Sequence, residues 1–315
     1  MPRLPRAITL ADPPDRRRAL RRRRRAETAT AWAYLSPAVV VVLGLSIVPV
    51  VWSLLLSFQA SDLVTPSRWV GVDNYRALAQ DPNFSQAVRN TLLYTVLYVP
   101  LSLLGGLLLA LALNQRIRLV GSYRTLIFVP FVLSATAQGV LFSFILDPEF
   151  GAANSVLHHL GVSPQGFLTD PGQALLVLVA VTLWSGTGFC VVVYLAALQD
   201  VPQSLVEAAR LDGAGRLHLL RHVTLPTLTP VTVFLLLWQI IQSLQVFDLV
   251  YVTTKGGPLG STTVIVYFIW EQAFKNATAG YGASAAYVLA VALGLAAGIV
   301  RLARRRERPR TEGAR

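Results

Sequence analysis

The stretch Glu207-Ala-Ala-Arg-Leu-Asp-Gly-Ala-Gly215 decides how this chain is organised, because it lies in a polar segment between two long apolar runs. A short helix is predicted over about Pro202–Leu211, since proline suits a first helical turn. Ser204 stands three residues before Glu207, the spacing of a capping box. Asp212-Gly213 is a turn signal, because glycine supplies the positive φ that stops a helix. The stretch therefore predicts a helix closed by a glycine turn.

The residues that follow predict a second short helix over about Arg216–Val223. Proline lacks a backbone N–H, so we expect this helix to end before Pro226, which can open the next apolar helix. The segment 199–228 is thus expected to form a helix, a glycine turn and a second helix, placed outside a membrane but between two membrane spans.

The composition is that of a membrane protein. Of the 315 residues, 54% are hydrophobic and 14% are charged, whereas soluble domains carry about 25% charged residues. Cys190 is the single cysteine of the sequence. It lies inside an apolar run, so it cannot form an intrachain disulfide and is expected to be a small packing residue.

Six apolar runs are long enough to cross a hydrocarbon core of about 30 Å. Lipid offers no partner to backbone groups, so each run is expected to be helical. We therefore predict an all-α polytopic membrane protein with six transmembrane helices, at 31–57, 91–113, 125–146, 173–197, 227–251 and 281–300. Ser261–Trp270 is apolar but too short to span, and is expected to be interfacial or re-entrant.

The positive charge is distributed unevenly between the two sides of this arrangement. With both termini inside, the cytoplasmic segments hold 10, 3, 3 and 7 basic residues, which is 23 of the 28 Lys and Arg. The positive-inside rule therefore predicts cytoplasmic termini and a cytoplasmic 199–228 segment. A net charge of +12 could also indicate a nucleic-acid partner. The arginines, however, flank the apolar runs, so no nucleic acid is expected.

The two ends of the chain are expected to be basic tails. Residues 1–30 are predicted to be a disordered cytoplasmic tail that touches anionic membrane lipid, and residues 303–315 a basic cytoplasmic tail. A signal peptide or a transit peptide is the alternative at the N-terminus. The run Ala31–Ser57 is too long for a signal peptide's apolar region, which favours a retained first span.

Several of these segments resemble one family. Glu207-Ala208-Ala209, Asp212-Gly213-Ala214 and Leu225-Pro226 resemble the EAA loop of binding-protein-dependent ABC importer permeases. Trp69–Tyr75, Asp147–Gly151 and Lys255–Pro258 also look like segments of that family. The resemblance covers about Ala31–Arg301. Ala196–Gln203 and Arg221–Pro226 are similar to the carbohydrate-uptake branch, which includes the permeases for maltose and glycerol-3-phosphate.

The resemblance implies a type I ABC importer permease fold, with its ABC transmembrane domain at residues 87–302. The segment 199–228, called the coupling loop from here on, would carry the movement of a cytoplasmic ATPase to the spans. It also implies a second, usually different, permease chain, two ATPase subunits and an extracytoplasmic solute-binding protein. The expected location is a bacterial-type plasma membrane.

Within the coupling loop, the resemblance assigns the ATPase contact to the following positions: Glu207, Ala208, Ala209, Asp212, Gly213, Ala214, Leu225 and Pro226. Glu207 is expected to pair with a basic residue of the ATPase. Gly213 is expected to permit the turn between the two short helices.

No catalytic chemistry is predicted for this chain. The sequence has no Gly-x-x-x-x-Gly-Lys-Ser/Thr phosphate loop, so ATP and Mg²⁺ are expected on the partner ATPase and no cofactor on this chain. Its four histidines have no metal-ligand spacing, and no nucleophile–base arrangement is arguable. The chain is therefore predicted not to be an enzyme and to hold no metal.

A substrate path is predicted from polar and aromatic residues inside two spans. In the fifth span these are Gln239, Gln242, Ser243 and Gln245; in the fourth, by resemblance to the maltose-type permease, they are Trp184, Ser185, Gly186 and Phe189. Amides and hydroxyls suit the hydroxyls of a sugar because they both donate and accept without charge. The alternative is that these residues hold helices together, as Gln and Ser do in membranes. Asp248, at the outer end of its span, could be merely interfacial.

Three other functions compete with a sugar importer. A secondary transporter without an ATPase would place ion-binding carboxylates at mid-membrane, and none lies near the centre of a predicted span. A membrane enzyme would need a catalytic constellation. An ABC permease for another cargo, such as an amino acid, a peptide or an anion, stays open as an alternative.

Overall fold

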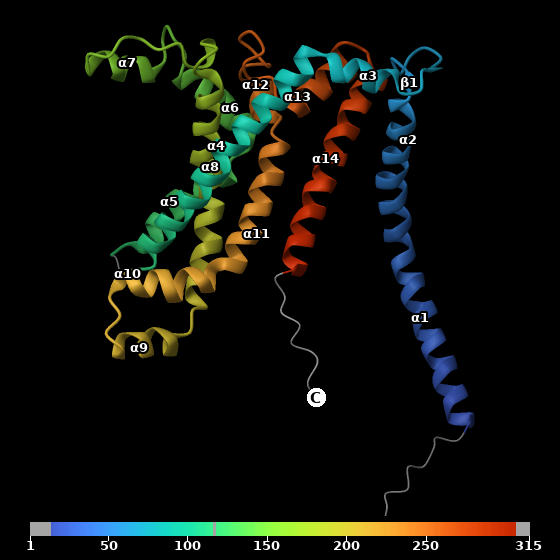
Figure 1. The fold of residues 1–315 in the computed structure, drawn as a ribbon, viewed down its shortest axis with the longest axis horizontal. Helices are drawn as coiled ribbons and strands as arrows, with labels where there is room; N and C mark the ends of the chain where they lie inside the picture. Colours follow the sequence, from blue (N-terminus) through green and yellow to red (C-terminus); the bar gives the residue numbers. More distant parts are fainter. Residues whose placement is uncertain (1–13, 116–117, 307–315) are drawn as a thin grey trace, which may run out of the picture. The chain divides into compact units, whose positions relative to one another are not determined.

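The computed structural model describes residues 14–115 and 118–306, which are mostly helical (Figure 1). The chain divides into two units, residues 1–55 and residues 56–315. Within the described ranges the strands are β1 (Gln59–Ala60) and β2 (Arg68–Trp69), an antiparallel pair with Gln59 opposite Trp69. This ribbon is a small correction to the predicted all-α class.

The first unit is a long helix. It contains α1 (Pro14–Val42), the π-helical turn η1 (Leu43–Ile47) and most of α2 (Val48–Ser57). The predicted tail 1–30 is corrected in part: residues 14–30 are helical, and residues 1–13 lie outside the described residues. Arginine and alanine are good helix formers, so the helix of the apolar run continues into them. An i,i+4 ion pair between Arg23 and Glu27, at 2.9 Å, supports it.

The second unit begins at Leu56 and holds the remaining helices. Their bounds are α3 (Asp73–Gln80), α4 (Pro82–Leu113), α5 (Val120–Val132), α6 (Ala135–Ile145), α7 (Ala152–His159), η2 (Phe167–Thr169), α8 (Ala174–Gln199), α9 (Gln203–Leu211), α10 (Arg216–Leu219), η3 (Leu220–Thr224), α11 (Leu225–Leu244), α12 (Asp248–Val252), α13 (Ile265–Trp270), η4 (Glu271–Lys275) and α14 (Ala279–Arg306).

Four helical stretches are long and apolar enough to cross a membrane: 27–57, 82–113, 174–199 and 216–252. The predicted third span is not one straight helix, because α5 and α6 meet at 98°. Counting that bent pair as one span makes five. The predicted sixth span lies in α14 (Ala279–Arg306), which contains the apolar stretch Ala279–Leu295. The short segment expected at Ser261–Trp270 contains the six-residue helix α13.

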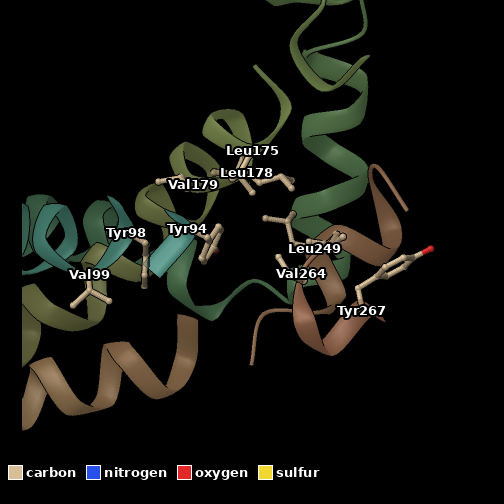
Figure 2. Packing of buried hydrophobic residues seen from close by; sticks show 11 residues of the cluster. Tyr94, Tyr98, Val99, Leu175, Leu178, Val179, Leu249, Val264 and Tyr267 are labelled. Carbon is tan, nitrogen blue, oxygen red and sulfur yellow. The ribbon is translucent and has the colours of Figure 1, made fainter. Parts of the chain in front are cut away.

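The core of the second unit forms where α4, α8 and α11 pack together. Figure 2 shows one cluster, in which Tyr94 and Tyr98 of α4 meet Leu178 of α8 and Leu249 of α12. A second cluster lies further along α8. Cys190 belongs to it and is fully buried, as expected for a packing residue.

The outside of the helices is apolar. Leu126 and Val132 of α5 are 71% and 70% exposed, and Leu108 of α4 is 58% exposed. An apolar exterior over long helices with internally paired backbones is the surface that lipid chains solvate.

Candidate functional site

The coupling loop projects from one end of the second unit (Figure 1). Its first helix is α9, which starts within a residue of the predicted Pro202 and ends at Leu211 as predicted. Gly213 has a φ of +82°. Two backbone bonds close the turn, from Gly213 N to Arg210 O at 3.0 Å and from Ala214 N to Ala209 O at 2.9 Å. This is a Schellman motif, so backbone conformation favours glycine here.

The predicted capping box is wrong. The N-cap is Pro202, and no side chain caps the helix. Ser204 is the second residue inside α9 rather than the residue before it, because the proline already fixes the extended entry into the helix. Glu207 therefore takes no part in capping α9, and this residue is exposed.

The predicted end of the second short helix is also wrong. α10 begins at Arg216 as expected, but it continues through the π-turn η3 into α11 without a break at Pro226. In that turn Leu225 N bonds to Leu220 O, an i→i+5 register. Because Pro226 lies in the first turn of α11, its missing N–H is tolerated. The coupling loop is thus joined to the fifth span by continuous helix.

The coupling loop presents both charge and apolar surface. Glu207, Ala208, Asp212, Leu225 and Pro226 are exposed, while Ala209 and Ala214 are half-buried. Three leucines of the loop are also largely exposed, with Leu205 at 51%, Leu211 at 89% and Leu217 at 77%. Exposed apolar side chains beside a carboxylate form a surface suited to another protein.

A cavity of about 250 Å³ lies among α4, α6, α8 and α11. The predicted substrate-path residues that line it are Gln239, Gln242, Ser243, Gln245, Ser185 and Gly186. Phe189 does not line it but stacks on Phe131, which does, with ring centroids 5.3 Å apart. Trp184 also lies outside the lining and meets Phe142 edge-on at 5.3 Å.

Two of the predicted path residues hold helices together. The Gln239 side chain is 2% exposed, and its Nε2 donates to Tyr98 Oη and Ser102 Oγ, both at 3.1 Å, and to Cys190 Sγ at 3.3 Å. Ser243 Oγ donates to Thr95 Oγ1 at 3.0 Å. These bonds join α11 to α4 and α8, which is the alternative role considered above.

The other polar residues of α11 and its continuation remain open to a ligand. Gln242, Gln245 and Asp248 are exposed and face the cavity. Asp248 is the only charged residue in the cavity lining that the structure describes. Two amides beside a single carboxylate can bind hydroxyl groups, both as donors and as acceptors.

Sequence reasoning missed the contribution of the second span. Tyr94 and Tyr98 both line the cavity, and Tyr94 Oη donates to Thr182 Oγ1 at 2.7 Å. The signal was present, since two tyrosines at i and i+4 of a span share one helix face. With Phe131 and Trp238 they give the cavity an aromatic wall.

The break in the third span also borders the cavity. Gln138 is 6% exposed, and its Nε2 donates to Leu133 O at 2.8 Å and Pro130 O at 3.3 Å. Both carbonyls lie at the end of α5, where helical donors run out; Pro130 O also accepts from Leu133 N at 3.3 Å. Ser134 Oγ accepts from Ala137 N at 3.2 Å and caps α6. Side chains therefore hydrogen-bond the polar backbone groups at the bend, as irregular backbone at membrane depth requires.

Comparison with known proteins places these features in a family. The model of the family described as "Binding-protein-dependent transport system inner membrane component" matches residues 88–308. The lactose transport system permease protein LacF of Rhizobium radiobacter is 34% identical, over 82% of this chain and 88% of that protein. The sulfoquinovosyl glycerol transport system permease protein SmoG of Agrobacterium fabrum is 33% identical, over 81% and 83%.

A solved structure is similar over almost the whole fold. It is a chain of a bacterial ABC transporter involved in the import of the acidic polysaccharide alginate. The TM-score is 0.81 at 25% identity, over 90% of this chain and 97% of that one. The bend in the third span and the helical coupling loop thus occur in a fold already seen in a transporter.

Proposed function

The chain belongs to the family of binding-protein-dependent transport system inner membrane components, and from this premise we propose that it is the permease subunit of an ATP-driven importer for a sugar or sugar-like solute. An exposed coupling loop at one end of residues 56–315 and a polar cavity among the spans of the same unit carry the proposal. Continuous helix from Arg216 to Leu244 links the coupling loop to the cavity.

Two arguments support a sugar as the cargo. Relatives are named as transport proteins for lactose, sulfoquinovosyl glycerol and arabinooligosaccharides. The cavity combines amides, hydroxyls and aromatic rings, which suit the polar edges and apolar face of a pyranose. Gln242, Gln245, Ser185 and Gly186 are proposed as path residues, with Tyr94 added to them.

The charge of the cavity favours an uncharged sugar. Its described lining holds Asp248 and no arginine or lysine. An acidic saccharide would meet a carboxylate with no cation to offset it, and like charges at close range repel. A uronate or sulfonate is therefore disfavoured as cargo.

The membrane arrangement proposed is six spans with both termini cytoplasmic, in a bacterial-type plasma membrane. The asymmetry of Lys and Arg supports it, with α14 as the sixth span. The coupling loop then lies in the cytoplasm, within reach of two ATPase subunits that carry ATP and Mg²⁺. A second permease chain would complete the pathway, and an extracytoplasmic binding protein would deliver the sugar.

The first experiment identifies what co-purifies with the tagged chain from its host in mild detergent. Glu207→Arg is compared with wild type and with Glu149→Arg, a charge reversal at an exposed residue outside the coupling loop. We expect an ATPase and a second permease with wild type and Glu149→Arg, and loss of the ATPase from Glu207→Arg. A chain that purifies alone would favour a secondary transporter.

A second experiment tests the path. Gln242→Ala is expected to raise the KM of sugar uptake, because it removes an exposed amide from the cavity. In a separate measurement, sugar uptake by the wild-type chain should stop when cellular ATP is depleted. It should persist when ionophores collapse the ion gradients. An unchanged KM would count against Gln242 as a path residue, and ionophore sensitivity would count against the importer itself.

A further inference from the structure

A larger cavity, of about 540 Å³, is lined by residues at the beginnings of α4 and α8. These beginnings lie at the end of the second unit opposite the coupling loop (Figure 1). The cavity lies beside the segment that precedes α13. Arg89 of α4 is the only charged side chain in the lining that the structure describes. The cavity is separate from the one formed by Gln242 and its neighbours.

Two polar side chains of this cavity, Arg89 and Ser261, lack protein partners among the described residues, whereas Gln86 donates to Leu259 O at 3.3 Å. Arg89 is exposed and takes part in none of the three ion pairs found among the described residues. Ser261 Oγ is buried and has no hydrogen-bond partner within the described part of the chain. A buried hydroxyl without a partner is costly, so a partner from outside the chain is expected. Asn90, by contrast, donates through its side-chain Nδ2 to Gly260 O and Thr263 O.

Beside Ser85 and Gln86, the lining also has an apolar side that includes leucines of α4 and α8. Leu93 of α4 is 45% exposed and Leu176 of α8 is 53% exposed, and both line the cavity. Leu175 beside them is buried in the core. The cavity thus has a cation and hydroxyls at one side and a path of leucines along two membrane helices at the other.

We infer that this cavity binds the phosphate headgroup of an anionic phospholipid. The phosphate would accept from the Arg89 guanidinium and the Ser261 hydroxyl, and an acyl chain would lie along Leu93 and Leu176. Residues 82–93 and 171–176 are at the ends of two spans, the level at which headgroups lie. An arginine guanidinium matches the geometry of a phosphate group and can bind it through two parallel N–H···O bonds. The inference does not depend on which solute is transported.

Native mass spectrometry of the full-length chain, purified with its accompanying subunits, tests this site. The probes are phosphatidylglycerol, phosphatidylcholine and inorganic phosphate. Arg89→Gln removes the charge and keeps a polar side chain. Arg76→Gln is the matched control, because Arg76 is an exposed arginine paired with Asp73 at 3.0 Å and lies outside the cavity.

We expect wild type and Arg76→Gln to retain phosphatidylglycerol in preference to phosphatidylcholine, and Arg89→Gln to bind it about fivefold more weakly. Leu176→Trp, which obstructs the apolar path and leaves Arg89 in place, should also lose the lipid. Equal retention by all variants would overturn the proposal. Displacement of the lipid by inorganic phosphate would overturn it too, since the site would then bind a free anion.

Discussion

The hydroxyl of Tyr98 stands so close to Gly186 that a Cβ added to this glycine would overlap it. Tyr98 comes from α4 and Gly186 from α8, and both line the 250 Å³ cavity. The same hydroxyl accepts from Gln239 Nε2 at 3.1 Å. The cavity wall therefore depends on the absence of a side chain at position 186.

Gly186→Ala should displace Tyr98 and disturb both the cavity and the Gln239 bond. We expect a loss of about 1–3 kcal/mol in the free energy of unfolding, as for other overpacked sites, and a several-fold loss of uptake. Adding Tyr98→Phe should restore part of the stability, because the next atom met is Tyr98 Cζ at 3.2 Å. Thermal unfolding and uptake are the measurements. Gly105→Ala is the control, since its new Cβ meets Thr187 Cγ2 at 3.6 Å; equal behaviour of the two alanine variants would refute the argument.

Gln138→Leu should destabilise the break in the third span. It would remove the donor that serves both Leu133 O and Pro130 O, and of the two only Pro130 O would keep another donor, Leu133 N at 3.3 Å. Leaving a buried acceptor unpaired costs about 1–3 kcal/mol. Thermal unfolding in detergent measures the change, with Gln242→Leu as the control at an exposed amide of the same cavity. If the two variants unfold at the same temperature, the Gln138 bonds do not stabilise the break.

The features that the sequence predicted are those determined by near neighbours. The end of α9 and the positive φ of Gly213 follow from a single glycine, because only a residue without a Cβ adopts that conformation at no cost. The positions of the long apolar helices follow from composition. The family resemblance rested on short local sequence motifs, and the match of the family model over residues 88–308 confirms it.

The features that the sequence analysis missed depend on contacts between distant residues or on a local change of helical register. Nothing local distinguishes Gln239, which ties three helices together, from Gln242 three residues later, which is exposed. The bend after Pro130 depends on a side chain eight residues further on. Pro226 was expected to end one helix and open the next; it does lie in the first turn of α11, but the π-turn η3 keeps the helix continuous into it. Each case is a tertiary or register effect that outweighs a local preference.

Asp62 makes the segment after β1 sensitive to pH. The backbone N–H of Thr65, then that of Val64, donate to its carboxylate and hold the pKa of Asp62 below its ordinary value. The stabilisation is therefore present above the unfolded pKa of about 3.9 and is lost as the pH falls through the depressed folded value. Hydrogen exchange at Val64 and Thr65, corrected for its intrinsic pH dependence, should speed up at acidic pH. Asp62→Asn should remove this dependence, and an unchanged profile would contradict the assignment.

Gly213→Val should disturb the turn of the coupling loop without a clash. No atom lies within 4 Å of a Cβ added there, so the cost comes from the φ of +82° alone. A β-branched residue resists this conformation by about 1–2 kcal/mol, which should weaken the Schellman bonds and lower ATP-driven uptake several-fold at normal expression. Gly213→Asn is the control, because asparagine tolerates the left-handed region, and it should keep most of the activity. Uptake and ATPase co-purification measure the effect. Normal uptake by Gly213→Val would mean that the turn does not carry movement from the ATPase to α11.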